Sequence, residues 1–303
     1  MIEKMKFRGH ETFFIRKGWL RKGIKNVLND ATLFVNKDKL PTDVLGIGAN
    51  MVKSLRYWLQ VVGLTTEVRG EKSGKREQII TDLGKVIYKN DPYFEELGTL
   101  WLLHYNLAKN ITDATSWYFF FNEFQMQEFT KDDFCLALKK FISINSKQEV
   151  ADSSLEGDFD CLVNTYIARA KSNPKKVDPE NNIDCPFGEL NLLDIKSKKD
   201  KIYTKVIPPK ASIHPLIALA IVVAQSDNAE VKIQTLLKGK NSLGKIFNLD
   251  MISLLELLNK IERLGYISVV RTAGLDVVKV KTKWTFLECV EQYYRAINNL
   301  GGE

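Results

Sequence analysis

The clearest periodic segment of the chain surrounds residue 55, where apolar side chains recur at helical spacing. The apolar stripe consists of Val52, Leu55, Leu59 and Val62. The opposite face carries side chains that can reach phosphates or base edges, namely Asn50, Lys53, Arg56, Tyr57 and Gln60. The pattern predicts an amphipathic helix with a polar, partly basic outward face.

The segments on either side of this helix have the pattern of a winged helix-turn-helix. The turn 46–48 contains two glycines, which let the chain reverse between two short helices, and Gly63 is suited to end the second helix. Extended stretches over 64–69 and 78–81 then enclose a basic turn. The cations of that turn, expected at a wing tip against phosphates, are Lys72, Lys75 and Arg76. Thr81 is expected to cap a closing helix.

A similar order of elements recurs near the C-terminus. A helix expected over 250–264 ends at Gly265, and an apolar strand, a glycine-containing turn and a second strand follow. This helix has charges of both signs and too many leucines for one narrow stripe, which predicts burial on two sides. We therefore expect a winged-helix-like module that contacts protein, with a homodimer through this region as one form of that contact.

Breaks in the pattern divide the chain into three expected domains: 1–91, a basic arm plus winged helix; 92–207, a helical middle; and 208–303, the C-terminal module. The middle contains an aromatic run, residues 117–124, whose helical spacing is typical of packing. The fold class predicted is mainly α with small β wings, an α+β protein.

Charge is distributed unevenly along the chain. The net charge is +7, yet residues 1–90 contain 18 Lys and Arg against 9 Asp and Glu, a balance of +9. Such an excess is expected for a polyanion partner such as double-stranded DNA, or for a merely solvated basic face. The sequence has no run of apolar residues that would span a membrane and no recognisable signal peptide. Four scattered cysteines favour a reducing, cytoplasmic location and argue against a zinc site.

The densest cluster of chemically capable side chains lies in the N-terminal tract, residues 7–20. A histidine beside a carboxylate can serve acid–base chemistry, so the candidate catalytic residues are His10, Glu11 and Arg16. An arm of this kind can also grip DNA, through Arg8, Arg16, Lys17, Arg21 and Lys22. The alternative is structural: the aromatic residues seat the arm in a core and His10 is hydrogen-bonded to backbone.

Strand cleavage usually needs carboxylates around a metal, or a nucleophile with a base. The further acidic candidates are Asp158, Asp160, Asp184 and Glu189, none with a specific spacing. The first two are expected to cap a helix over 161–170, and the last two to shape a loop. Cys185 could carry a persulfide, although a buried thiol is the more ordinary reading.

The string GHETFFIRKGWLRKG, residues 9–23, resembles the opening signature of a bacterial family of unknown function, number four thousand and seven. Residues 98–108 with 114–124, and residues 184–190, resemble the same family. The resemblance implies kinship with the DNA-nicking component of Ssp-type DNA phosphorothioation systems. Those systems place sulfur into one DNA strand for phage defence, beside a cysteine desulfurase, an ATPase and a sulfotransfer enzyme.

Three functions remain open at this point. The first is a DNA-binding, nicking subunit of a phosphorothioation machine, with Mg²⁺ or Mn²⁺ as its cofactor if it is a nuclease. The second is a non-enzymatic winged-helix regulator or adapter for the modification enzymes. The third is a protein-binding scaffold without affinity for DNA.

Overall fold

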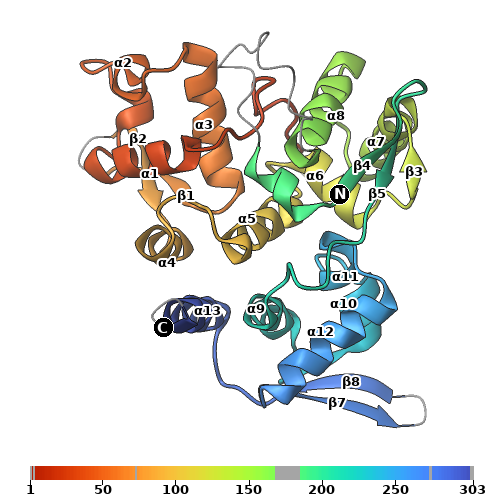
Figure 1. The fold of residues 1–303 in the computed structure, drawn as a ribbon. Coiled ribbons are helices and arrows are strands. Elements are labelled where there is room, and N and C mark those ends of the chain that lie inside the picture. The colour runs from red at the N-terminus through yellow and green to blue at the C-terminus, as the bar shows by residue number, and fades with distance from the viewer. Residues whose placement is uncertain (1, 3, 72–73, 168–184, 273–274, 301–303) are drawn as a thin grey trace, which may run out of the picture. The chain divides into compact units, whose positions relative to one another are not determined.

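The computed structural model describes residues 2, 4–71, 74–167, 185–272 and 275–300. The chain divides into two compact units, Met1–Lys205 and Val206–Glu303, so the expected domains 1–91 and 92–207 fall almost wholly within the first. Helices predominate, and the strands form three small antiparallel sheets (Figure 1). The α+β class with small sheets is therefore confirmed.

From α2 onward, the first half of unit 1 follows the order of elements that the sequence predicts. Its elements are α1 (Trp19–Asn29), η1 (Leu33–Val35), α2 (Pro41–Leu45), α3 (Ala49–Val61), β1 (Thr65–Arg69), β2 (Arg76–Ile80) and α4 (Asp82–Asn90). Gly46 ends α2 at φ 60° and Gly63 follows α3 at φ 79°, a backbone region that favours glycine. The predicted apolar stripe of α3 is buried throughout.

The two strands after α3 form a hairpin with continuous register from Thr65 opposite Ile80 to Arg69 opposite Arg76. A third chain segment touches the same hairpin, because the Gln78 N–H donates to the Ala31 carbonyl at 2.8 Å. Thr81 caps α4 as predicted, since its side chain accepts the Gly84 N–H. The basic turn between the strands includes Lys72, which lies outside the described residues.

The second half of unit 1 is a helical layer with one small sheet. Its elements are α5 (Leu97–Lys109), α6 (Thr115–Asn122), β3 (Glu128–Phe129), α7 (Lys131–Asn145), α8 (Asp152–Tyr166), η3 (Pro186–Leu190), β4 (Leu193–Ser197) and β5 (Ile202–Lys205). The aromatic run of α6 is buried, with Phe120 fully so, which confirms that it serves packing. The prediction of a helix starting at 161 was wrong, because α8 begins nine residues earlier and contains Asp158 in its interior.

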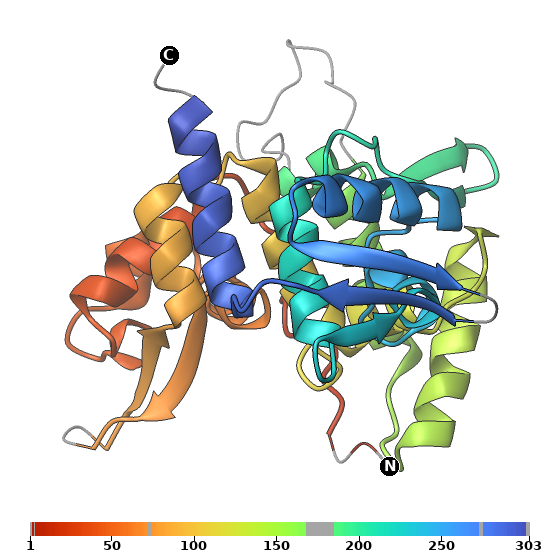
Figure 2. The ribbon, with the colours of Figure 1, turned by 90° about the horizontal axis from the view of Figure 1, so that it is seen from below.

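Unit 2 repeats the order of helices followed by a hairpin. Its elements are α9 (Pro215–Gln225), β6 (Glu230–Lys232), α10 (Ile233–Lys238), α11 (Leu243–Ile246), α12 (Met251–Arg263), β7 (Ile267–Thr272), β8 (Leu275–Val280) and α13 (Phe286–Leu300). The sheet order is β6-β8-β7, and Figure 2 shows β7 and β8 running alongside α12. Within the single chain, helix α12 buries Leu254, Leu258 and Ile261, whereas Met251 and Ile252 at its start are exposed.

None of the helices in the described parts of the chain combines the length and apolar character that a membrane crossing requires.

Candidate nucleic-acid interface

The outward face of α3 presents two exposed polar side chains near its start. Lys53 is 63% exposed, and its Nζ lies 3.3 Å from Asn50 Oδ1 and 3.9 Å from Glu11 Oε1. An ion pair this exposed contributes little to stability because solvent screens it. Lys53 is thus free to exchange Glu11 for an external anion.

Arg56, one turn further along α3, is held by a carboxylate of the hairpin. Its Nε and Nη2 both donate to one oxygen of Glu67 on β1, and Arg76 Nη1 lies 3.4 Å from the other oxygen. The Glu67 side chain is 21% exposed, so this cluster is half-buried. Arg56 is therefore oriented and partly neutralised, while Arg76 on β2 stays largely exposed.

Tyr57 was expected on the outward face and is instead 5% exposed, which corrects that placement. The reason is the N-terminal tract, which packs over α3: a Cβ added at Gly9 would lie 2.5 Å from the Tyr57 ring. Burial, with a further contribution from Asp158, raises the pKa of Tyr57 well above its ordinary value. A side chain so enclosed has no surface to offer DNA.

The N-terminal tract is fixed along its length to the helical layer of unit 1. The Ile2 N–H donates to the Asn145 carbonyl at 2.8 Å, and the Lys6 N–H donates to Thr115 Oγ1 at 3.1 Å. Its far end is bound to α3, since the Phe13 carbonyl accepts the Trp58 indole N–H at 2.9 Å. The tract is a docked strap, which favours the structural reading of its aromatic residues.

His10 is the centre of this docking and is fully buried. Its Nε2 lies 2.8 Å from Asp158 Oδ1, while its Nδ1 accepts the Thr12 N–H at 3.0 Å. The acceptor role of Nδ1 places the proton on Nε2, which donates to the carboxylate. The Trp58 and Trp117 rings pack against the imidazole, with centroids 6.3 and 5.6 Å away.

Asp158 accepts two further hydrogen bonds, one from the strap and one from α6. Its Oδ1 also accepts the Arg8 N–H at 2.8 Å, and its Oδ2 accepts the Ser116 hydroxyl. Hydrogen bonding of this density satisfies a buried carboxylate that would otherwise be costly. Both ring nitrogens of His10 are thus engaged, and the imidazole anchors the strap to α8.

The backbone around His10 is strained. Arg8, Glu11 and Thr12 have φ values of 55°, 50° and 69°, in the left-handed region that non-glycine residues seldom adopt. Residues in this conformation persist where contacts with the surrounding structure hold them in place, and they concentrate at functional sites. The strained turn carries Arg8, Glu11 and Thr12 outward while His10 points in.

The proposed catalytic trio is not brought together. Glu11 is 38% exposed beside Lys53, whereas the Arg16 guanidinium lies over the Phe13 and Trp19 rings at 5.7 and 5.3 Å. No hydrogen bond or ion pair joins the three side chains among the residues described. Arg8 is exposed, and its guanidinium lies against Gly157 of α8, because a Cβ there would meet Arg8 Nε at 3.6 Å.

The remaining acidic candidates and thiols are scattered. Asp160 pairs with Lys131 at the surface, Glu189 is exposed, and Asp184 lies outside the described residues. Cys185 is buried. Burial raises the pKa of Cys135 to about 11, which keeps this thiol protonated.

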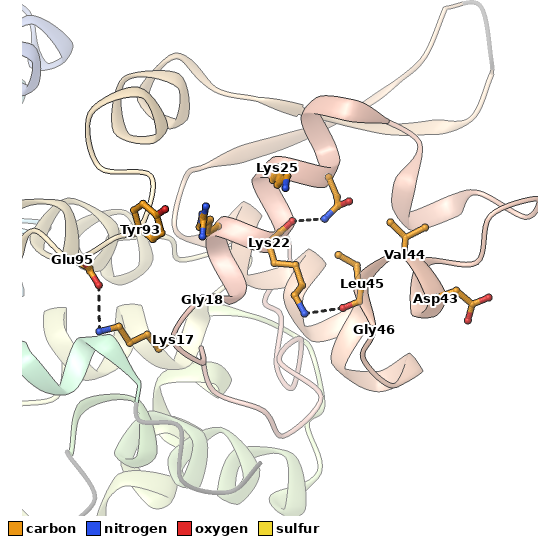
Figure 3. A pocket seen from close by; sticks show the side chains of 12 residues that line it. Lys17, Gly18, Lys22, Lys25, Asp43, Val44, Leu45, Gly46, Tyr93 and Glu95 are labelled. Atoms are coloured by element: carbon orange, nitrogen blue, oxygen red, sulfur yellow. Dashed lines mark hydrogen bonds and ion pairs between the residues drawn. The ribbon is translucent and has the colours of Figure 1, made fainter. Parts of the chain in front are cut away.

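Lys17, Arg21 and Lys22 lie together on and just before α1, where they line a pocket with Lys25 (Figure 3). The spacing of Arg21 and Lys25 by four residues places them on one face of α1, a signal that the sequence contains. Tyr93, which also lines this pocket, comes from the segment between α4 and α5 and carries no such signal. The role of Asp158 also has no signal in the sequence, because its partner His10 is 148 positions away.

Comparison with known proteins places the chain in a family. The family model described as "Protein of unknown function (DUF4007)" matches residues 7–294. The chain belongs to this family. The matched range includes the strained turn, α3 and α12. Among curated proteins, none matches.

Two solved structures share the fold. They are titled "Magnesium ion-bound SspB crystal structure" and "SspB crystal structure". Each has a TM-score of 0.83 and 23% sequence identity, over 97% of this chain and 89% of the other.

One of these SspB structures is bound to a magnesium ion, so we looked for side chains in this chain that could ligate one. Magnesium prefers carboxylate oxygens in octahedral geometry and keeps several waters. Within residues 2–300, apart from the gaps given above, no three His, Cys, Asp or Glu side chains converge as a metal site.

Proposed function

We propose that this protein is the DNA-binding component of a bacterial DNA phosphorothioate modification and phage-defence system. The observation that carries the proposal is a set of cations on α3, the strained turn and the hairpin. Arg56 is half-buried beside Glu67, and the exposed members are Arg8, Lys53, Lys75 and Arg76. Membership of the DUF4007 family and the fold shared with SspB support it.

The proposed docking mode is that of a winged helix. A helix, a glycine-containing turn, a second helix and an antiparallel hairpin are the order of such modules, whose second helix enters the major groove. In unit 1 that helix is α3, and its exposed N-terminal half carries Asn50 and Lys53. Unit 2 has the same order with a three-stranded sheet.

Charge reversal at α3 tests the docking mode. Lys53→Glu is expected to weaken duplex binding by tenfold or more at low salt, because a phosphate contact is lost and a repulsive charge is added. The slope of log affinity against log salt should decrease by about 1 to 2 for the same reason. Lys198→Glu, an exposed lysine on the β4–β5 turn of the same unit, is the control. Fluorescence anisotropy over a salt series measures both quantities, and unchanged binding with an unchanged slope would refute the assignment.

Strand nicking is the proposed chemical activity, on the resemblance to the nicking component of Ssp systems. The assay is conversion of supercoiled plasmid to open circles in Mg²⁺ or Mn²⁺ and in EDTA. Glu11→Gln, which retains the shape of the strained turn, is expected to abolish nicking while DNA binding persists. Glu189→Gln is the matched carboxylate control, and nicking that survives Glu11→Gln moves the search to other acidic residues.

One observation favours the second candidate, a non-enzymatic adapter that positions DNA for the ATPase and the sulfotransfer enzyme. His10 is enclosed and fully hydrogen-bonded, so it touches no substrate in this conformation. An adapter predicts intact DNA binding with no open circles under any metal condition. The plasmid assay therefore separates the two candidates.

For unit 2 we propose contact with a second copy of the chain. Met251 and Ile252 at the start of α12 are 39% and 64% exposed, and Leu264 at its end is 51% exposed. Ile252→Asp is expected to lower the mass seen by light scattering from dimer to monomer while leaving duplex affinity per chain unchanged. A monomeric unmodified protein would sink this proposal.

A further inference from the structure

Unit 1 has a concave surface separate from the outward face of α3. Helices α1 and α2 and the segment before α5 enclose a pocket of about 610 Å³ (Figure 3). Pockets of this size hold small ligands or single building blocks of polymers. Its charged lining consists of Lys17, Arg21, Lys22 and Lys25 against Asp43 and Glu95.

The cations of the pocket differ in how strongly they are bound to other groups of the protein. Lys17 Nζ lies 3.6 Å from Glu95 Oε1, with both side chains exposed, and Lys22 Nζ donates to the Leu45 carbonyl at 2.9 Å. Lys25 is exposed and makes no hydrogen bond or ion pair with any residue that the structure describes. Lys17 and Lys25 are therefore available to an incoming anion.

The backbone at the rim leaves room for a ligand. Gly18 precedes α1 at φ 84° and Gly46 follows α2 at φ 60°, and a Cβ on either would meet nothing within 4 Å. The first turn of α1 carries no acidic side chain and no side-chain cap. An anion near this turn gains from the positive end of the helix dipole as well as from the lysines.

One wall of the pocket is aromatic. Tyr93 is 53% exposed, and the Arg21 guanidinium carbon lies 3.9 Å from its ring centroid. This cation–π contact keeps a flat π surface at the wall of a basic pocket. Aromatic rings beside cations bind single-stranded nucleic acid, where the ring stacks on a base and the cations hold the backbone.

We propose that the pocket binds one unpaired nucleotide of a DNA strand, its phosphate on Lys17 and Lys25 and its base against Tyr93 and Arg21. An intact duplex fits this chemistry poorly, because its bases are stacked and paired inside the double helix and cannot lie against Tyr93. The inference rests on the proposed function in taking DNA as the partner. The pocket contains none of the α3 residues, so the proposed nucleotide site and the proposed duplex contact of α3 can be refuted separately.

The experiment compares three ligands with the full chain by anisotropy and calorimetry: a 12-nucleotide oligothymidine, a closed hairpin duplex without unpaired ends, and thymidine monophosphate. Tyr93→Ala is expected to weaken oligothymidine binding about tenfold, the effect of losing one stacked base, and to change hairpin binding less than twofold. Lys25→Glu is expected to weaken oligothymidine binding to a similar degree and also to reduce the slope of log affinity against log salt, because a phosphate contact is lost. Tyr93→Phe keeps the ring and should behave as the unmodified protein, as should Lys198→Glu.

Each result bears on the proposal. Unchanged oligothymidine binding in Tyr93→Ala overturns it, as does an equal loss of oligothymidine and hairpin binding. Thymidine monophosphate binding as tightly as the oligonucleotide overturns it in favour of a free-nucleotide site. Lys53→Glu should weaken only the hairpin, so its failure to do so counts against the α3 assignment and leaves the pocket standing. Melting curves verify that each variant folds.

Discussion

The imidazole of His10 donates a hydrogen bond to the carboxylate of Asp158 at 2.8 Å, across 148 positions of sequence and out of contact with solvent. The pair joins the N-terminal strap to the interior of α8. It converts a tract that has the composition of a flexible DNA-gripping arm into a fixed part of the helical layer. The cations beside it are thereby held in place before any ligand arrives.

Removal of His10 is expected to cost stability. In His10→Ala the buried Asp158 carboxylate loses one of its donors and a cavity opens beside two tryptophans, so the free energy of unfolding should fall by about 3 to 5 kcal/mol. His10→Gln retains an N–H donor, so its free energy of unfolding should fall by less than that of His10→Ala. Urea unfolding measures both. Full stability combined with lost nicking would instead identify His10 as a chemical participant.

The strain at Thr12 should be removable. A β-branched residue at φ 69° is unfavourable, whereas asparagine tolerates this region, so Thr12→Asn is expected to raise the free energy of unfolding by about 1 kcal/mol. Thr66→Asn, in the extended strand β1, is the control and should be neutral or destabilising. If Thr12→Asn destabilises as well, the threonine side chain itself supports the turn.

Glu67 is expected to restrain DNA affinity. Its carboxylate neutralises Arg56 and Arg76, so Glu67→Gln should strengthen duplex binding several-fold at low salt and steepen the salt slope by about 1. Glu189→Gln removes an exposed carboxylate elsewhere in the unit and serves as the control. Weaker binding in Glu67→Gln would mean that orientation of Arg56 matters more than its charge.

Unit 2 should lose stability on acidification through His214. This residue precedes α9 and its Nδ1 accepts the Leu216 N–H at 3.2 Å, while burial lowers its pKa below the ordinary value of 6.5. The unfolded chain therefore binds the proton more readily, and stability that is complete above pH 6.5 declines as pH falls towards the folded pKa. His214→Asn keeps a cap without a titrating ring. Thermal melts between pH 7.5 and 5 should show a smaller decline for this variant than for the unmodified protein.

Local patterns of the sequence suffice for most helices and for the β1–β2 and β7–β8 hairpins, whereas the β4–β5 hairpin in the expected helical middle was not predicted. The stripe of α3, the glycines after α2 and α3 and the cap at Thr81 are contained within a few residues, so propensity and periodicity decide them. The start of α8 was missed because acidic residues at positions 158 and 160 have the composition of a cap, whereas the buried contacts of Asp158 keep it inside the helix.

The sequence by itself determined the class of fold, the positive charge of the first 90 residues and the family resemblance, because each depends on composition or short-range order. Tertiary structure alone decided which of those charges are exposed and which are engaged. Tyr57 and His10 are enclosed because the strap packs over α3, and Arg56 is neutralised by a carboxylate from the hairpin. Such pairings depend on closing long loops, and no local pattern encodes the partner across that distance.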